Sequence, residues 1–118
     1  MLRHNRFSMR KEYKKLVRDL IPDIIRKNGG MPEIRVLDET EYLGELKKKF
    51  QEELAEYLSA ETSAARLEEM ADIFEVITAL NEAEGRDIEQ VIAVQKQKRI
   101  ERGAFAERIF LESVEEKE

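Results

Sequence analysis

The chain of 118 residues contains no cysteine and no tryptophan, and its single histidine, His4, lies near the start. Without cysteine, a disulfide scaffold, a thiolate zinc site, an iron–sulfur cluster and a cysteine nucleophile are all excluded. One histidine at the edge of the chain leaves little basis for histidine catalysis or for a histidine metal site. Any polar chemistry must therefore come from carboxylates, lysine and arginine.

Long apolar runs are also missing. No segment approaches the roughly 20 apolar residues that cross a bilayer, and the basic start lacks the apolar core of a secretory signal. The chain has 21 Lys and Arg against 26 Asp and Glu, a net charge of −5. Neutralising phosphates requires surplus cations. We therefore expect a cytoplasmic protein that binds neither nucleic acid nor a membrane.

Glycine and proline are scarce, at five and two residues, while 40% of the chain is charged, which is typical of helical proteins. Apolar residues recur at helical period in three long segments, residues 38–60, 64–84 and 87–103. Asp38 and Asp87 open the first and third segments, each with Glu or Gln three residues later as in a capping box. In the second segment, Val76 is expected at the margin of the apolar stripe. A shorter helix around Pro22 precedes them.

Several β-prone stretches flank these helices, and we expect short strands in them: residues 15–18, 34–37 and 108–114. The predicted fold class is therefore mainly all-α, a helical-bundle protomer with short β pieces near the termini. The predicted domain covers residues 13–114. A flexible lead-in of residues 1–12 precedes it, and a charged tail of residues 115–118 follows.

Some carboxylates interrupt the apolar faces of the two longest helical segments. Glu53 lies seven residues after Leu46, which places it within roughly 20° of that leucine at about 100° per residue. Glu56 lies at the edge of the same face, and Glu69 and Asp72 border the face of the second segment. Each pair has the i, i+3 spacing that brings side chains together on one side of a helix.

If the two helices pack antiparallel, these four carboxylates converge. Four unpaired charges in a half-buried cleft repel one another and cost desolvation free energy, so a hard cation such as Mg²⁺ or Mn²⁺ is the expected occupant. Glu68 and Glu75 point the opposite way, as solvated charges do. The alternative is that such pairs arise by chance among 26 acidic residues and form only solvated faces and salt bridges.

Cations gather late on the third long helical segment. Lys98 and Arg102 form an i, i+4 pair and point to the side that carries the apolar stripe. This arrangement is suited to a polyphosphate. The alternative is that they stabilise the carboxyl end of the helix. Lys15 and Arg18 are further candidates for phosphate contacts, with plain surface cations as the alternative.

Three motifs resemble one known family. Residues 52–56 and 69–72 read E-E-x-x-E and E-x-x-D, twelve residues apart, and resemble the signature of the all-α NTP pyrophosphohydrolases. That superfamily includes MazG-like proteins, dimeric dUTPases and phosphoribosyl-ATP pyrophosphohydrolase. Residues 13–22, YKKLVRDLIP, resemble the opening of the MazG-like, phosphoribosyl-ATP pyrophosphohydrolase-like subgroup, and residues 98–105, KRIERGAF, resemble its K-x-x-x-R-G-G-F pattern.

The resemblance implies hydrolysis of a nucleoside triphosphate between its α and β phosphates, which yields a monophosphate and pyrophosphate. It implies Mg²⁺, with Mn²⁺ as an alternative, held by Glu53, Glu56, Glu69 and Asp72. It also implies that Lys98 and Arg102 hold the phosphate chain, and Glu52 is a candidate to orient the attacking water. The chain departs from the family pattern at Leu20, where lysine is expected, and at Ala104, where glycine is expected.

The family further implies that helices of two protomers complete each bundle, so we expect a homodimer or a dimer of dimers. Candidates for the contact between subunits are Tyr57, Leu58, Phe74 and Ile77. Two other functions stay open at this point: phosphoribosyl-ATP pyrophosphohydrolase of histidine biosynthesis, and a non-catalytic helical oligomerisation module. The sequence leaves the base and sugar preference open.

Overall fold

The computed structural model describes residues 9–117. Its helices are α2 (Ile21–Lys27), α3 (Glu39–Ser59), α4 (Ser63–Ala83) and α5 (Ile88–Arg102). Within residues 9–117 there is no strand, which confirms the all-α prediction. The chain divides into two compact units, of which the first ends at Leu80 and the second begins at Asn81. The domain limits of 13 and 114 stay a prediction, and residues 1–8 of the lead-in and residue 118 of the tail lie outside the described residues.

The β pieces expected near the termini were a wrong prediction. The three β-prone stretches, residues 15–18, 34–37 and 108–114, are neither helix nor strand. Extended backbone becomes a strand only when a second strand supplies ladder hydrogen bonds, and within residues 9–117 no such partner exists. In addition, Lys14 and Arg108 adopt left-handed φ angles of 47° and 58°, which interrupt the extended backbone at the start of two of these stretches.

Helix α3 begins where the sequence predicts. The Asp38 side chain accepts a hydrogen bond of 2.8 Å from the Glu41 backbone N–H, so it satisfies a donor that the first turn leaves unpaired. The Glu41 carboxylate instead accepts from Arg35 at 2.8 Å. Thr62 caps α4 in the same way, accepting from the Ala65 backbone N–H at 3.1 Å.

Helix α5 opens with a complete capping box. The Asp87 carboxylate accepts from the Gln90 backbone N–H at 3.1 Å, and the Gln90 amide oxygen accepts from the Asp87 backbone N–H at 3.0 Å. Gly85 and Gly103, which follow α4 and α5, have φ angles of 80° and 83°. Glycine adopts this left-handed conformation at little cost, so both glycines favour the observed helix ends.

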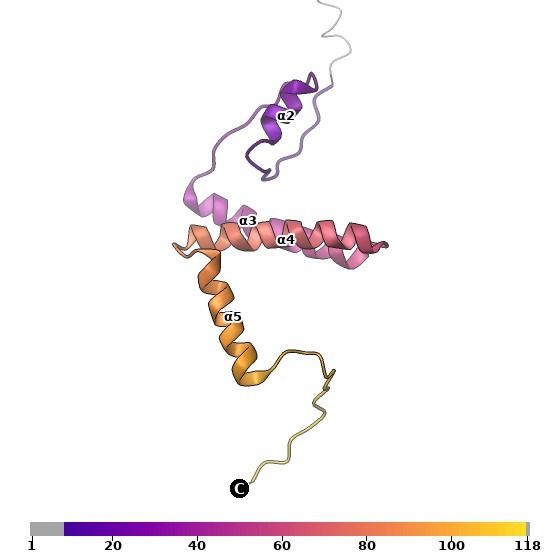
Figure 1. The fold of residues 1–118 in the computed structure, drawn as a ribbon. Coiled ribbons are helices and arrows are strands. Elements are labelled where there is room, and N and C mark those ends of the chain that lie inside the picture. The colour runs from indigo at the N-terminus through magenta and orange to yellow at the C-terminus, as the bar shows by residue number, and fades with distance from the viewer. Residues whose placement is uncertain (1–8, 118) are drawn as a thin grey trace, which may run out of the picture. The chain divides into compact units, whose positions relative to one another are not determined.

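Helices α3 and α4 form an antiparallel hairpin, joined by a short loop, and lie side by side (Figure 1). The buried apolar side chains among the described residues are Leu46 of α3 and Ile73 and Val76 of α4. Val76, expected at the margin, is only 6% exposed. The prediction was wrong because the contact face of α4 follows residues 69, 73, 76 and 80, which recur every three or four positions, and so lies closer to the carboxylates.

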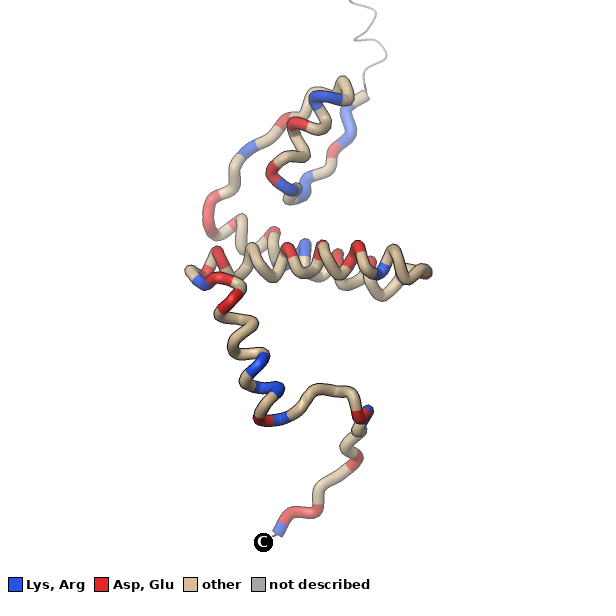
Figure 2. Tube along the Cα trace, viewed as in Figure 1, with Lys and Arg blue, Asp and Glu red and all other residues tan. Residues whose placement is uncertain are grey.

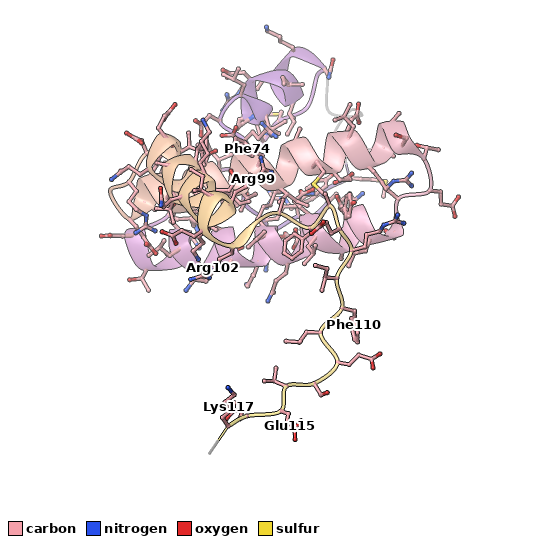
Figure 3. All side chains as sticks on the ribbon, turned by 60° about the horizontal axis from the view of Figure 1, so that its bottom comes forward. Phe74, Arg99, Arg102, Phe110, Glu115 and Lys117 are labelled. Atoms are coloured by element: carbon pink, nitrogen blue, oxygen red, sulfur yellow. The ribbon has the colours of Figure 1, made fainter. Side chains whose placement is uncertain are left out.

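The second unit contains α5 and a carboxyl-terminal segment without helix or strand. Figure 3 shows Phe110 on that segment, and the structure leaves its side chain largely exposed, like those of Phe105 and Leu111. Within residues 9–117, none of the helices is long and apolar enough to cross a membrane.

Candidate metal centre

Helical register places two glutamates on the contact face between α3 and α4. Glu53 lies two turns after Leu46 and is only 7% exposed. Glu69 lies one turn before Ile73 on α4 and is half-buried, as is Asp72. Because the hairpin is antiparallel, the later half of α3 faces the earlier half of α4, and residues 16 and 19 positions apart in sequence come together.

One carboxylate oxygen from each of Glu53, Glu69 and Asp72 lies within 4.8 Å of the others. The Oε2 atoms of Glu53 and Glu69 are shielded from solvent and accept no hydrogen bond from any described residue. A buried carboxylate oxygen without a partner loses its hydration and gains nothing in return. The pair therefore requires a proton or a cation between its oxygens.

The pKa values reflect this crowding. Burial raises the pKa of Glu53, and the charge of Glu56 raises it further, against a lowering by the hydrogen bond with Glu69. The pKa of Glu69 rises to about 7, first because of its side-chain hydrogen bond with Glu53, then because of shielding from water and the proximity of Glu56. The crowding of the carboxylates therefore favours the protonated form of Glu69 when no metal is bound.

The oxygens suit a hard divalent cation. Mg²⁺ and Mn²⁺ prefer carboxylate oxygen, and the cluster offers neither sulfur nor imidazole. Metal–oxygen distances of about 2.1 Å place ligand oxygens roughly 3.0–4.2 Å apart in an octahedron. The upper limit of 4.8 Å on the observed separations lies close to that range.

Two cations already lie against these carboxylates. The Arg18 Nη2 atom donates to Asp72 Oδ1 at 2.7 Å, and the Lys49 Nζ atom lies 3.7 Å from Glu53 Oε1. Arg18 comes from the segment before α2, 54 residues away from Asp72 in sequence. The structure thus places Arg18, a predicted phosphate contact, on a predicted metal ligand.

The remaining predicted residues of the first unit fall in different places. Glu56 is exposed but close enough to raise the pKa of both Glu53 and Glu69, so it lies at the rim of the oxygen cluster. Glu52 is exposed on α3. Lys15 is exposed, with its Nζ atom 5.9 Å from the centre of the Tyr13 ring. Glu68 and Glu75 are exposed as expected.

Lys98 and Arg102 belong to the second unit, where they line an open groove of about 960 Å³ along α5. Figure 2 shows lysine and arginine gathered in the later half of this helix, and Figure 3 shows Arg99 and Arg102 on its last turns. Arg86 and Arg99 also line the groove, and none of its described lining residues is acidic. Within residues 9–117, neither Lys98 nor Arg102 forms an ion pair. The groove therefore suits an anionic group.

Sequence reasoning missed several of these residues. Lys49 precedes Glu53 by four residues, the spacing of a helical ion pair, so a local signal existed for it. Arg99 of the groove lies beside Lys98, which was identified. No local pattern could have paired Arg18 with Asp72, because that contact depends on how the segment before α2 folds back onto α4.

Comparisons with known proteins give one partial likeness. No family model matches the chain, and no solved structure matches it significantly. Over 53 residues the chain is 49% identical to an uncharacterized protein of Mycolicibacterium smegmatis. The matched stretch covers 45% of this chain and 54% of that protein, so the chain spans about half the length of the curated relative that it matches.

Proposed function

We propose that the protein is a metal-dependent nucleoside triphosphate pyrophosphohydrolase, which cleaves between the α and β phosphates to give a nucleoside monophosphate and pyrophosphate. The observation that carries the proposal is the oxygen cluster of Glu53, Glu69 and Asp72, with two shielded oxygens that lack any donor. The resemblance of three motifs, in the same order, to the all-α NTP pyrophosphohydrolases supports it.

In this proposal Glu53, Glu69 and Asp72 hold Mg²⁺ or Mn²⁺, and Glu56 at the rim completes the site. When bound, the ion lowers the pKa of a coordinated water and offsets charge on the phosphates. Because the carboxylates lie on two helices packed against each other, their positions are set before substrate binds, which reduces the cost of assembling the site.

Two further roles belong to the proposal. Glu52, exposed one residue before Glu53, is the candidate to orient the attacking water and accept its proton. Lys98 and Arg102 hold the phosphate chain, which is supported by their position in a groove free of described carboxylates. Charge-assisted bonds from such cations give both affinity and orientation.

We also propose that the protein is a homodimer or a dimer of dimers. Leu58 and Leu67 are each 72% exposed, and Phe74 is 52% exposed. Tyr57 and Ile77, the other expected contact residues, are half-buried. Large apolar side chains along a hairpin with few buried residues are typical of a bundle completed by a second protomer.

The same exposed side chains favour a second candidate function, a non-catalytic helical oligomerisation module. Pyrophosphate release distinguishes the two functions, measured with Mg²⁺ over a panel of normal and damaged NTPs and dNTPs. Phosphoribosyl-ATP is included because its dominance over the other substrates would identify the histidine-pathway activity. Asp72→Asn is expected to abolish release, and Glu75→Gln, an exposed change on the same helix, to preserve it. No release from any substrate would leave the oligomerisation module as the better proposal.

A further inference from the structure

Arg18 is held at the rim of the carboxylate cluster by a contact that spans 54 residues of sequence. Its Nη2 atom lies 2.7 Å from Asp72 Oδ1, which is the length of a strong charge-assisted hydrogen bond. The backbone carbonyl of Arg18 accepts from the Ile21 N–H at 3.0 Å, in the turn that leads into α2. The guanidinium is thus carried by a locally fixed backbone, and its side chain can change partner without that backbone moving.

The cluster uses its own cations as counter-ions. Arg18 contacts Asp72, and Lys49 lies 3.7 Å from Glu53. With Glu56 at the rim, two cations face four carboxyl groups, so the cations of the chain offset only part of the negative charge. The carboxylate of Glu69 forms no ion pair with a cation among residues 9–117.

We infer that Arg18 competes with the divalent cation for Asp72 and thereby sets the metal affinity of the site. The inference rests on the proposed metal centre and goes beyond it. A guanidinium and a divalent ion on one carboxylate repel each other, and an ion that neutralises the cluster weakens the attraction that holds Arg18. Metal binding therefore releases the guanidinium.

Release changes what Arg18 can do. While it is paired with Asp72, its charge is directed at a protein carboxylate. Once displaced by the metal, it becomes a free cation beside the metal centre, able to contact an anionic phosphate. Arg18 thus pairs with Asp72 in the metal-free site and is free to bind phosphate in the metal-bound site. Both its observed contact and the phosphate role that the sequence predicted are then explained.

The solvent exposure of the Arg18 and Asp72 side chains determines how strongly Arg18 weakens metal binding. The Arg18 side chain is 56% exposed and that of Asp72 is 41% exposed, so solvent screens the pair. An exposed pair of good geometry contributes in the upper half of the usual range. Removing Arg18 is therefore expected to tighten metal binding about three- to fivefold, which corresponds to roughly 0.7–1 kcal/mol.

The first test is a calorimetric titration of the metal-free full chain with MnCl₂ and with MgCl₂. Arg18→Ala and Arg18→Gln are expected to bind about three- to fivefold more tightly than wild type, and Arg18→Lys to stay close to wild type. Arg26→Ala is the matched control, because Arg26 is similarly exposed and pairs with Asp23 away from the cluster. Equal affinities in the Arg18→Ala and Arg26→Ala variants would overturn the competition alone. No metal binding to wild type would overturn the metal centre and this inference with it.

The second test needs no variant. Phenylglyoxal modifies free guanidinium groups, and peptide mass spectrometry reports the rate at each arginine. Mn²⁺ is expected to increase the modification rate of Arg18 about threefold or more by breaking its contact with Asp72, and to leave Arg26 unchanged. An Arg18 rate that is unchanged or lower with Mn²⁺ would show that the guanidinium stays on Asp72, and the inference would be wrong.

Discussion

Replacing Glu53 by glutamine is expected to stabilise the metal-free protein. Glu53 is 7% exposed, its Oε2 atom has no donor, and the nearest shielded oxygen, on Glu69, lacks one as well. Glutamine has nearly the same shape, carries no charge, and its amide N–H₂ can donate to Glu69. The substitution therefore removes an unfavourable burial and supplies a missing hydrogen bond.

The magnitude follows from these two terms. A buried polar group without a partner costs about 1–3 kcal/mol. Losing the contact with Lys49, at 3.7 Å, subtracts at most about 0.5 kcal/mol. The removal of the buried charge outweighs the lost ion pair. The net gain of roughly 0.5–2.5 kcal/mol corresponds to an increase in melting temperature of about 2–10 °C for a chain of this size.

With metal bound, wild type is expected to become more stable than Glu53→Gln. Mg²⁺ or Mn²⁺ binds the folded site and stabilises wild type by about 2.7 kcal/mol at a hundredfold excess over its dissociation constant. Glu53→Gln lacks one hard oxygen ligand and is expected to lose most of this shift together with hydrolysis.

Calorimetric melting of both proteins, with chelator and with metal at a fixed protein concentration, measures the two effects. Glu68→Gln, an exposed change on α4, serves as the control and is expected to match wild type in both conditions. If Glu53→Gln and Glu68→Gln melt alike in both conditions, the carboxylates form an ordinary solvated surface and the reasoning is refuted.

Three further predictions address pH, the phosphate contacts and assembly. The pKa of Glu69 is raised from 4.5 to about 7, so the folded chain binds a proton at Glu69 more tightly than the unfolded chain does. The stability that this proton confers is complete below pH 4.5 and is lost as the pH rises through 7. Melting in chelator from pH 4.5 to 8 should show this decline, and a Glu69→Gln variant with the same slope would contradict it. Arg102→Ala is expected to lower kcat/KM about ten- to a hundredfold while the metal affinity measured by calorimetry is kept. The control Lys96→Ala, a change outside the groove, should leave the kinetics unchanged. Equal kinetics in both variants would mean that Arg102 only stabilises the end of its helix. Light scattering should find a dimer or tetramer at micromolar concentration, and Leu58→Glu should shift it toward monomer. The Leu58 side chain is 72% exposed in the protomer, so a charge there disturbs only a contact between protomers. A monomeric wild type would refute the assembly.

The sequence by itself determined what depends on neighbouring residues. The start of α3 at Asp38, the capping box of Asp87 and Gln90, and the end of α5 before Gly103 all follow from hydrogen bonds within a few residues. Helical period alone predicted that Glu53 points with Leu46 into the contact face, and the structure buries it there.

Only the tertiary structure decided which side chains meet. The register of the α3–α4 hairpin selects Glu53, Glu69 and Asp72 for the oxygen cluster and leaves Glu56 at its rim. The same register turned Val76 inward, against the prediction, because the face that packs is defined by the partner helix as well as by its own sequence.

Features that depend on residues far apart in the sequence were the hardest to predict from it. The β-prone stretches near the termini are not strands, since a strand requires a second segment to pair with and local propensity cannot supply one. Arg18 reaches Asp72 across 54 residues because the charge of the assembled carboxylates attracts it. That charge accumulates only when α3 and α4 pack together, so a counter-ion contact of this kind is a property of the folded chain and is invisible in any local pattern.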